Sequence, residues 1–339
     1  MKLSILDQVP ISSMQTPQDA LFESVKLAQA GEKLGYNRYW IAEHHDLSGL
    51  ACSAPEVMLG LLGTHTKTIR IGSGAVLLPH YKPYKVAEIY NMLATLFPNR
   101  IDLGIGRAPG GSAEVTNALS DNFLQNVWKM PKSVEELLHF IYNDFPSDHE
   151  FAKISAAPVP NTPPKPWLLG TSKKSAKLAA EMGMAYTFGL FMSDSDGKNI
   201  IRQYRDNFSP RKQGDKPEVI VTVSAICSDT TENAEDIALS SFVWGLQKEK
   251  GIGTNGLPTI EKAKEYITNE KVNDAFEKMK KKAIIGDPKL VISRLEELKE
   301  TYQADELMIV TITHSPEDRI RSYELIAKEA LCKNPLSKN

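Results

Sequence analysis

Short apolar runs alternate with longer amphipathic stretches along most of the chain. The runs are rich in β-branched and aromatic residues, which favours buried strands, whereas apolar positions spaced three and four apart indicate helices. Eight strands are predicted in this way, at residues 3–9, 39–42, 69–78, 101–106, 167–170, 185–189, 219–227 and 306–312. Helix patterns lie between and after them, at 17–34, 53–63, 84–96, 131–142, 171–183, 199–208, 230–250, 260–282, 287–302 and from 315 onward.

This alternation predicts an α/β fold, and eight strand–helix repeats are the number found in a (β/α)₈ TIM barrel. A doubly wound sheet is the competing fold. It would place a glycine-rich turn directly after the first strand, and residues 10–15 contain no glycine. We therefore expect residues 1–339 to form one TIM-barrel domain.

Two segments interrupt the regular pattern. Residues 107–165 contain a Gly-, Ser- and Asn-rich stretch, a single helix pattern and then a cluster of prolines. Irregular segments of this length in a compact domain are usually lids or binding loops, so we expect 107–165 to be a lid inserted after the fourth strand. Extra helices are predicted after the seventh strand, separated by the Gly-rich segment 251–256.

Composition is that of an ordinary globular protein and excludes several classes of partner. Of 339 residues, 42% are hydrophobic and 24% charged, and a net charge of −2 gives no reason to expect nucleic acid or an anionic membrane as partner. The cysteines Cys52, Cys227 and Cys332 are far apart, which argues against a disulfide framework or zinc ribbon, and no metal site is expected. The N-terminus lacks the apolar core of a signal peptide, so a cytoplasmic location is expected.

Candidate catalytic residues lie where strands end and loops begin. Glu43, His44 and His45 follow the second strand, and in a barrel the residues just past each strand converge on one face. Carboxylate and imidazole groups in that position suit proton transfer. Adjacent histidines on a strand point to opposite faces, so the pair is not expected to chelate one metal, and one of them could be hydrogen-bonded packing.

A second group of polar residues follows the fourth and fifth strands. Arg107, Thr171, Ser172 and Ser175 combine one guanidinium with hydroxyl groups at a helix N-terminus, an arrangement that favours phosphate or another anion. A plain helix N-cap at Thr171-Ser172 is the alternative interpretation. His314, after the last strand, is a further candidate by position alone.

Glycines occupy unusual places in the third and fourth strands. The segment Gly72-Ser73-Gly74-Ala75 lies where glycine weakens a strand, which indicates unusual backbone dihedrals or close approach of a ligand. Gly104 and Gly106 are only a weak dinucleotide-binding signal because the third glycine of that motif is missing. They fit better with a flat ligand lying against the barrel rim.

These motifs together resemble the bacterial luciferase-like flavin-dependent monooxygenases, in the branch of single-polypeptide oxidoreductases of unassigned substrate. The resemblance covers nearly the whole chain, and the motifs are loose individually but specific in this order and spacing. It rests on Glu43-His44-His45, Gly72-Ser73-Gly74-Ala75-Val76, Gly104-Ile105-Gly106-Arg107, Leu169-Gly170-Thr171-Ser172 and Ser175-Ala176-Lys177-Leu178-Ala179-Ala180. Position 106 is glycine where the light-emitting subunits carry a reactive cysteine, so thiol reactivity is not expected there.

The resemblance implies an enzyme that uses reduced FMN and O₂ to oxidise a small organic substrate. It implies a non-proline cis peptide bond at Gly74–Ala75, beneath the flavin ring. It also implies that His44 handles protons near the reactive ring edge, with Glu43 and His45 orienting it. The residues implied to hold the flavin phosphate are Arg107, Thr171, Ser172 and Ser175.

The resemblance extends to partners. Because no nicotinamide-binding fingerprint is present, reduced flavin is expected from a separate flavin reductase. Family habit implies a homodimer through residues 54–66 and 84–97. Two alternatives stay open: a hydride-transferring oxidoreductase that uses a deazaflavin or nicotinamide, and a non-catalytic flavin-binding barrel. The intact Glu43-His44-His45 and the long segment 107–165 argue against the latter, and Trp128 and Met130 within that segment point to a mostly apolar substrate.

Overall fold

A closed ring of parallel strands forms the centre of the molecule. The computed structural model describes residues 1–252, 256–270 and 272–332. Its strands are β1 (Leu3–Asp7), β2 (Arg38–Ile41), β3 (Arg70–Ser73), β4 (Val76–Leu77), β5 (Ile101–Gly106), β6 (Lys165–Gly170), β7 (Ala185–Gly189), β8 (Val219–Cys227), β9 (Ile284–Gly286) and β10 (Glu306–Val310). The ring runs β1-β2-β3-β5-β6-β7-β8-β10 and closes where β10 pairs with β1, so the predicted TIM barrel is confirmed.

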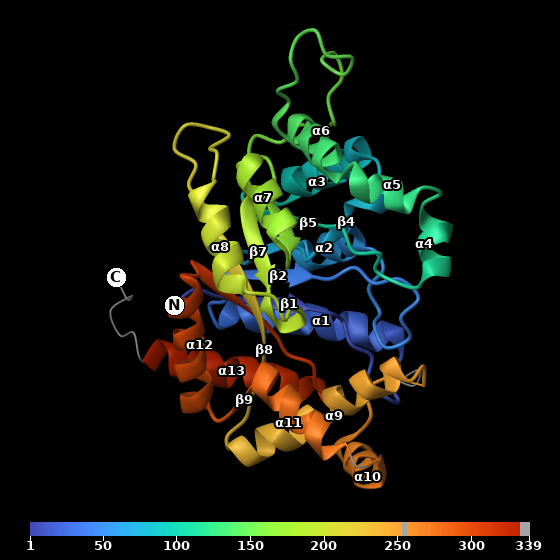
Figure 1. The fold of residues 1–339 in the computed structure, drawn as a ribbon, viewed down its shortest axis with the longest axis vertical. Helices are drawn as coiled ribbons and strands as arrows, with labels where there is room; N and C mark the ends of the chain where they lie inside the picture. The colour runs from blue at the N-terminus through green and yellow to red at the C-terminus, as the bar shows by residue number, and fades with distance from the viewer. Residues whose placement is uncertain (253–255, 271, 333–339) are drawn as a thin grey trace.

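Helices surround this ring (Figure 1). They are α1 (Pro17–Lys33), α2 (Pro55–His65), α3 (Pro83–Leu96), α4 (Ala113–Leu119), α5 (Phe123–Trp128), α6 (Met130–Tyr142), α7 (Lys173–Glu181), α8 (Gly197–Asp206), α9 (Thr231–Glu249), α10 (Ile260–Glu270), α11 (Asn273–Lys282), α12 (Pro288–Tyr302) and α13 (Pro316–Cys332). Two short 3₁₀ helices, η1 (Leu78–His80) and η2 (Leu190–Met192), follow β4 and β7. No helix among the described residues is both long enough and apolar enough to cross a membrane.

Local sequence signals explain where many helices begin. Thr16 caps α1 and forms a reciprocal capping box with Asp19, and the proline at the next position suits the first turn. Asp287 is the N-cap of α12, where its side chain accepts hydrogen bonds from two backbone N–H groups of the first turn and a proline follows.

The structure differs from the predicted elements in four places. The third strand is split into β3 and β4 at Gly74–Ala75, and Leu78 belongs to η1. The stretch expected to be irregular after residue 107 contains α4 and α5. The helix predicted over 260–282 is two helices, and β9 was not predicted because three residues are too few to show a period. Part of the Gly-rich segment 251–256 lies outside the described residues.

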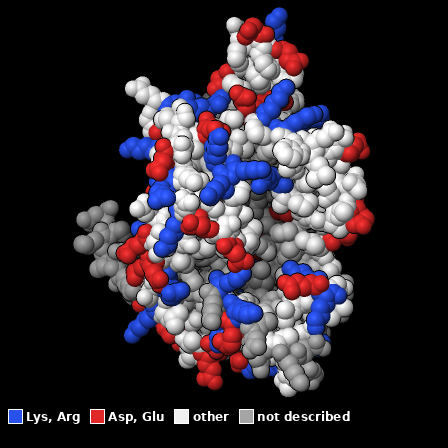
Figure 2. All heavy atoms as spheres, in the orientation of Figure 1, with Lys and Arg blue, Asp and Glu red and all other residues white. Residues whose placement is uncertain are grey.

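The segment between β5 and β6 covers one side of the barrel. It contributes α4, α5 and α6, and then a long excursion that leads back to β6, visible at the top of Figure 1. Helix α6 packs against α3 and α5 packs against η1, so the first part of the segment is built onto the barrel. Basic and acidic side chains are interspersed over the face drawn in Figure 2, as expected for a net charge close to zero.

The inside of the barrel has an apolar layer above a polar one. Leu6, Trp40, Trp167, Ile220 and Met308 fill the apolar layer, and the two indoles meet edge to face at 5.5 Å. Such aromatic pairs add stability beyond the area they bury.

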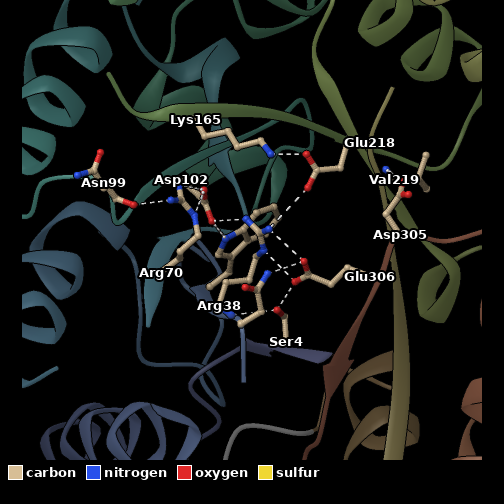
Figure 3. Close-up of polar contacts among 12 residues, drawn as sticks. Ser4, Arg38, Arg70, Asn99, Asp102, Lys165, Glu218, Val219, Asp305 and Glu306 are labelled. Carbon is tan, nitrogen blue, oxygen red and sulfur yellow. Dashed lines mark hydrogen bonds and ion pairs between the residues drawn. The ribbon is translucent and has the colours of Figure 1, made fainter. Parts of the chain in front are cut away.

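The polar layer lies at the N-terminal ends of the strands (Figure 3). Arg38, the first residue of β2, is its centre. Its guanidinium bonds Glu306 on β10 through Nε at 2.8 Å and Nη2 at 3.0 Å, and Asp102 on β5 through Nη1 at 2.8 Å. Asp102 also accepts hydrogen bonds from Arg70 on β3, at 2.6 Å, and from the indole of Trp40, at 3.0 Å. One network therefore ties four strands together around the ring.

The charged side chains of this polar layer can be buried because each has a partner of opposite charge. Burial alone would raise the pKa of Asp102, but Arg38 and Arg70 outweigh it and hold that pKa below its usual value. For Arg38, burial would lower the pKa, but Asp102 and Glu306 raise it. Each charge in the layer is therefore stable only in the presence of its partners.

Removing one partner should show this dependence. We expect Asp102→Asn to lower the free energy of unfolding at pH 7 by about 3–5 kcal/mol, because the buried guanidinium of Arg38 and the half-buried one of Arg70 each lose a counter-charge. Urea unfolding measures the difference. The control is Glu23→Gln, which breaks an exposed pair with Lys26 and should cost less than about 0.5 kcal/mol.

The effect of Asp102→Asn on the free energy of unfolding should depend on pH. The folded-state pKa of Asp102 is depressed, so its contribution is fully present above the unfolded value near 3.8 and is lost as the pH falls through the folded value. The difference between wild type and Asp102→Asn should therefore persist from pH 7 to pH 5 and narrow only in strong acid. Equal stability of the two variants at pH 7 would contradict this account.

Candidate active site

A cavity of about 420 Å³ opens at the C-terminal ends of the barrel strands. This size lies within the range of small-molecule sites, roughly 300–1,000 Å³. Residues at or just beyond the ends of β1, β2, β4, β5, β6 and β7 line it, together with Thr222 on β8. The sequence-predicted residues that line it are Glu43, His44, Gly74, Ala75, Arg107, Thr171, Ser172 and Ser175.

His44 presents a half-buried imidazole to this cavity. Its backbone N–H donates to the carbonyl of Cys52 at 2.9 Å, while its ring Nδ1 is buried and has no hydrogen-bond partner among the described residues. Burial, with the nearby charges of Lys248 and His45, lowers the pKa of His44 to about 4. The ring is therefore neutral at pH 7 and has an uncommitted nitrogen.

Glu43 makes a different set of contacts. Its Oε1 accepts hydrogen bonds from Tyr81 at 2.7 Å and pairs with His45 Nε2 at 2.8 Å, and its Oε2 accepts one from the backbone N–H of Leu77 at 3.1 Å. Burial raises the pKa of Glu43. These contacts anchor β4 to the loop after β2 and do not engage Nδ1 of His44, so no hydrogen bond links Glu43 or His45 to that nitrogen.

The floor of the cavity is formed by backbone and small residues. The Gly74–Ala75 peptide bond is cis, as the family resemblance predicted. Gly106 lies beside it, and a Cβ atom at that position would come within 3.2 Å of the Ala75 Cβ. Glycine at 106 therefore leaves the floor open to a flat ligand.

The residues predicted to bind an anion lie together in the cavity wall. Arg107 is exposed, and its Nη2 lies 3.3 Å from Oγ of Ser172. Ser172 caps α7 and shares reciprocal hydrogen bonds with Ser175. Helix α7 begins with Lys173 and Lys174, and basic side chains gather over this helix in Figure 2. Ser172 is thus a helix N-cap, which confirms that interpretation, and it also lines the cavity; its role in anion binding stays a prediction.

Two predicted candidates lie outside the cavity wall. His45 is buried against Glu43, and its ring meets that of His80 edge to face at 5.9 Å. His314 lies in the loop after β10, where its Nε2 is 3.2 Å from Oγ of Ser13.

Some lining residues were not predicted. Thr187 and Thr222 point inward from β7 and β8, and Phe191 and Met192 come from η2. A single threonine inside an otherwise apolar strand is a signal that sequence analysis could have used, because a polar group in a barrel interior needs a partner or a ligand. No local sequence signal predicts η2.

Comparison with known proteins agrees with this geometry. The family described as luciferase-like monooxygenase matches residues 1–304. The Bacillus subtilis protein YceB, uncharacterised in function, is 40% identical over 326 residues, which cover 96% of this chain and 98% of YceB. The N-acetyl-S-alkylcysteine monooxygenase of the same organism is 35% identical over 333 residues, covering 97% of this chain and 98% of its own.

Solved structures show the same fold. Apo-MsnO8 is 32% identical, with a TM-score of 0.88 and 97% of each chain covered. The oxygenating constituent of 3,6-diketocamphane monooxygenase from Pseudomonas putida, solved with FMN, is 18% identical with a TM-score of 0.71 and covers 98% of each chain. An F420-dependent secondary alcohol dehydrogenase is 16% identical with a TM-score of 0.66, covering 97% of this chain and 98% of its own.

The family match spans most of the chain, and relatives above 30% identity cover nearly all of it. The predicted resemblance is confirmed, and with it the expectation of an enzyme. The chain belongs to the luciferase-like monooxygenase family.

Proposed function

We propose that this protein is an FMN-dependent monooxygenase, which uses reduced FMN and O₂ to oxidise a small organic substrate. The observation that carries the proposal is one cavity whose wall brings together Arg107 and Ser172, the Gly74–Ala75 backbone and the neutral imidazole of His44. These are the three features that a phosphorylated flavin and its reacting partner require of a protein.

The donor set fits the phosphate of FMN. Arg107, Thr171, Ser172 and Ser175 would hold it, because a guanidinium fork and hydroxyl groups at a helix N-terminus favour a dianion. The tricyclic ring would lie on Gly74–Ala75 and beside Gly106, which line the cavity. The apolar wall of Leu6, Leu77 and Leu169 would exclude water from the ring.

The protein's own chemistry centres on His44. Reduced FMN supplies the electrons that activate O₂, so that one oxygen atom enters the substrate and the other leaves as water. His44, uncharged at pH 7, can accept or donate a proton at Nδ1. Glu43 and His45 are positioning residues that fix β4 and the loop carrying His44.

A separate flavin reductase would supply reduced FMN. The neighbour with 3,6-diketocamphane activity is named as an oxygenating constituent, which supports a two-component arrangement here. The segment predicted as a lid, 107–165, would act as the lid over the substrate; its last residue, Lys165, is the first residue of β6. Thioethers of the N-acetyl-S-alkylcysteine class are the first substrates to test, because a relative at 35% identity is named for them.

The phosphate assignment predicts a selective loss of binding. Arg107→Ala should weaken binding of FMN by about tenfold or more and leave binding of riboflavin nearly unchanged, because riboflavin lacks the phosphate. Fluorescence titration with each flavin measures both affinities. Lys177→Ala, an exposed lysine paired with Glu181 on the same helix, is the matched control. Equal losses for FMN and riboflavin would contradict the assignment.

The role of His44 predicts a loss of turnover without loss of cofactor. His44→Ala should bind FMN like wild type and form oxidised thioether at least about a hundredfold more slowly, since proton transfer by a positioned side chain contributes that much or more. Product is measured by mass spectrometry in a coupled assay with a flavin reductase. His65→Ala, an exposed histidine on α2, is the control.

Two outcomes would overturn parts of this proposal. Turnover that survives His44→Ala would remove the proton-transfer role. Substrate oxidation that needs a deazaflavin or nicotinamide and consumes no O₂ would replace monooxygenation with hydride transfer, and flavin binding without any turnover would indicate a flavin-binding barrel.

We also propose a homodimer through α2 and α3, with a cytoplasmic location. Val57, Met92 and Leu96 are exposed on these helices, and large exposed apolar side chains on neighbouring helices are typical of an interface. Met92→Glu should shift the protein toward monomer in analytical ultracentrifugation, because a charge would be buried at the contact. An unchanged sedimentation profile would exclude α3 from the interface.

A further inference from the structure

Helix α9 reaches over the rim of the barrel beside His44. The indole of Trp244 packs with Leu47, Leu50 and Ile312, which lie just past the ends of β2 and β10. It also lies directly against Gly49, where a Cβ atom would collide with the ring. The C-terminal turns of α9 are therefore fixed onto the loop that follows His44 and His45.

Lys248, one turn beyond Trp244, brings an ammonium group to this rim. Its Nζ lies 3.5 Å from the centroid of the Trp244 ring, and its charge contributes to the lowered pKa of His44. The side chain is exposed, so a ligand can reach it. No carboxylate in the described part of the chain forms an ion pair with it.

The charges around the cavity are unbalanced at this end. Among the described residues that line the cavity, Glu43 is the one carboxylate, and its oxygens are already bonded to His45, Tyr81 and Leu77. His44 is neutral at pH 7, so it adds no charge. Arg107 lies beside Ser172, where the proposed function places the flavin phosphate. Lys248 does not itself line the cavity; held against Trp244, which packs on the loop that follows His44, it supplies a second cation beside the cavity.

We propose that Lys248 is a specificity-determining residue that binds a carboxylate on the organic substrate, while the apolar wall of the cavity receives the rest of the molecule. The inference rests on the proposed function, because it assigns the substrate class of the same site. The body of the substrate would extend from Lys248 past His44 to Leu6 and Phe191, which line the cavity. A carboxylate on the substrate would supply the counter-charge that the chain does not provide for Lys248.

A binding experiment tests the proposed carboxylate subsite at Lys248 without requiring turnover. Calorimetry on the enzyme loaded with oxidised FMN would compare an N-acetyl-S-alkylcysteine with its neutral carboxamide. We expect wild type to bind the carboxylate at least about tenfold more tightly than the amide, as a charge-assisted hydrogen bond would give. Lys248→Met should reduce this ratio to near one by weakening the carboxylate alone, and Lys248→Arg should keep most of the preference.

Lys250→Met is the matched control, since it removes the same charge two residues away on the same helix end, where Lys250 lies near the ring of Tyr266. It should keep the wild-type ratio. The inference is overturned if wild type shows no preference, if it binds neither ligand, if Lys248→Met keeps the ratio, or if that variant weakens both ligands equally. The proposed function fails separately, by absence of oxygenated product from carboxylate and amide alike, whereas product formation without a carboxylate preference overturns only the subsite.

Discussion

Arg38 holds the N-terminal end of the barrel closed. Its guanidinium joins β2 to β5 through Asp102 and to β10 through Glu306, and it is almost entirely buried. A buried charge of this kind persists only when its partners are present with good geometry, so the network fixes which strands meet and in what register. Above it, Trp40 and Trp167 fill the barrel, and the candidate site lies beyond them, toward the C-terminal ends of the strands.

The stabilising Arg38 network and the candidate active site therefore lie at different ends of the barrel. The polar groups at the lower end are paired with one another, whereas those at the upper end include groups that the chain leaves uncommitted, such as Nδ1 of His44 and the ammonium of Lys248. Glu43 belongs to both categories. It lines the cavity, but its hydrogen bonds to Leu77, Tyr81 and His45 make it a structural clamp on β4. Uncommitted polar groups beside a cavity are what a binding site requires, because a ligand can then satisfy them.

The sequence was informative where local signals are strong. Period and length predicted the barrel strands, and strand ends predicted most of the cavity wall, because a parallel barrel brings those ends to one face. The cis bond at Gly74–Ala75 came from family resemblance, since no local rule predicts it. The Arg38 network could not be predicted, because Arg38 and Glu306 are 268 residues apart and only the closed ring brings them together. The resemblance implied that Glu43 orients His44, the residue adjacent to it in sequence. In the structure their side chains do not interact. The helices α4 and α5 were missed because they have only seven and six residues, too few to establish a period.

Monooxygenation by reduced FMN is the central claim, and isotopic labelling tests it most directly. The purified protein would be supplied with reduced FMN by a flavin reductase, in the presence of an N-acetyl-S-alkylcysteine and isotopically labelled O₂. The account predicts a product that carries one labelled oxygen atom, formed only when protein, FMN and O₂ are all present. A product without the label, or oxidation that proceeds in the absence of O₂, would contradict it.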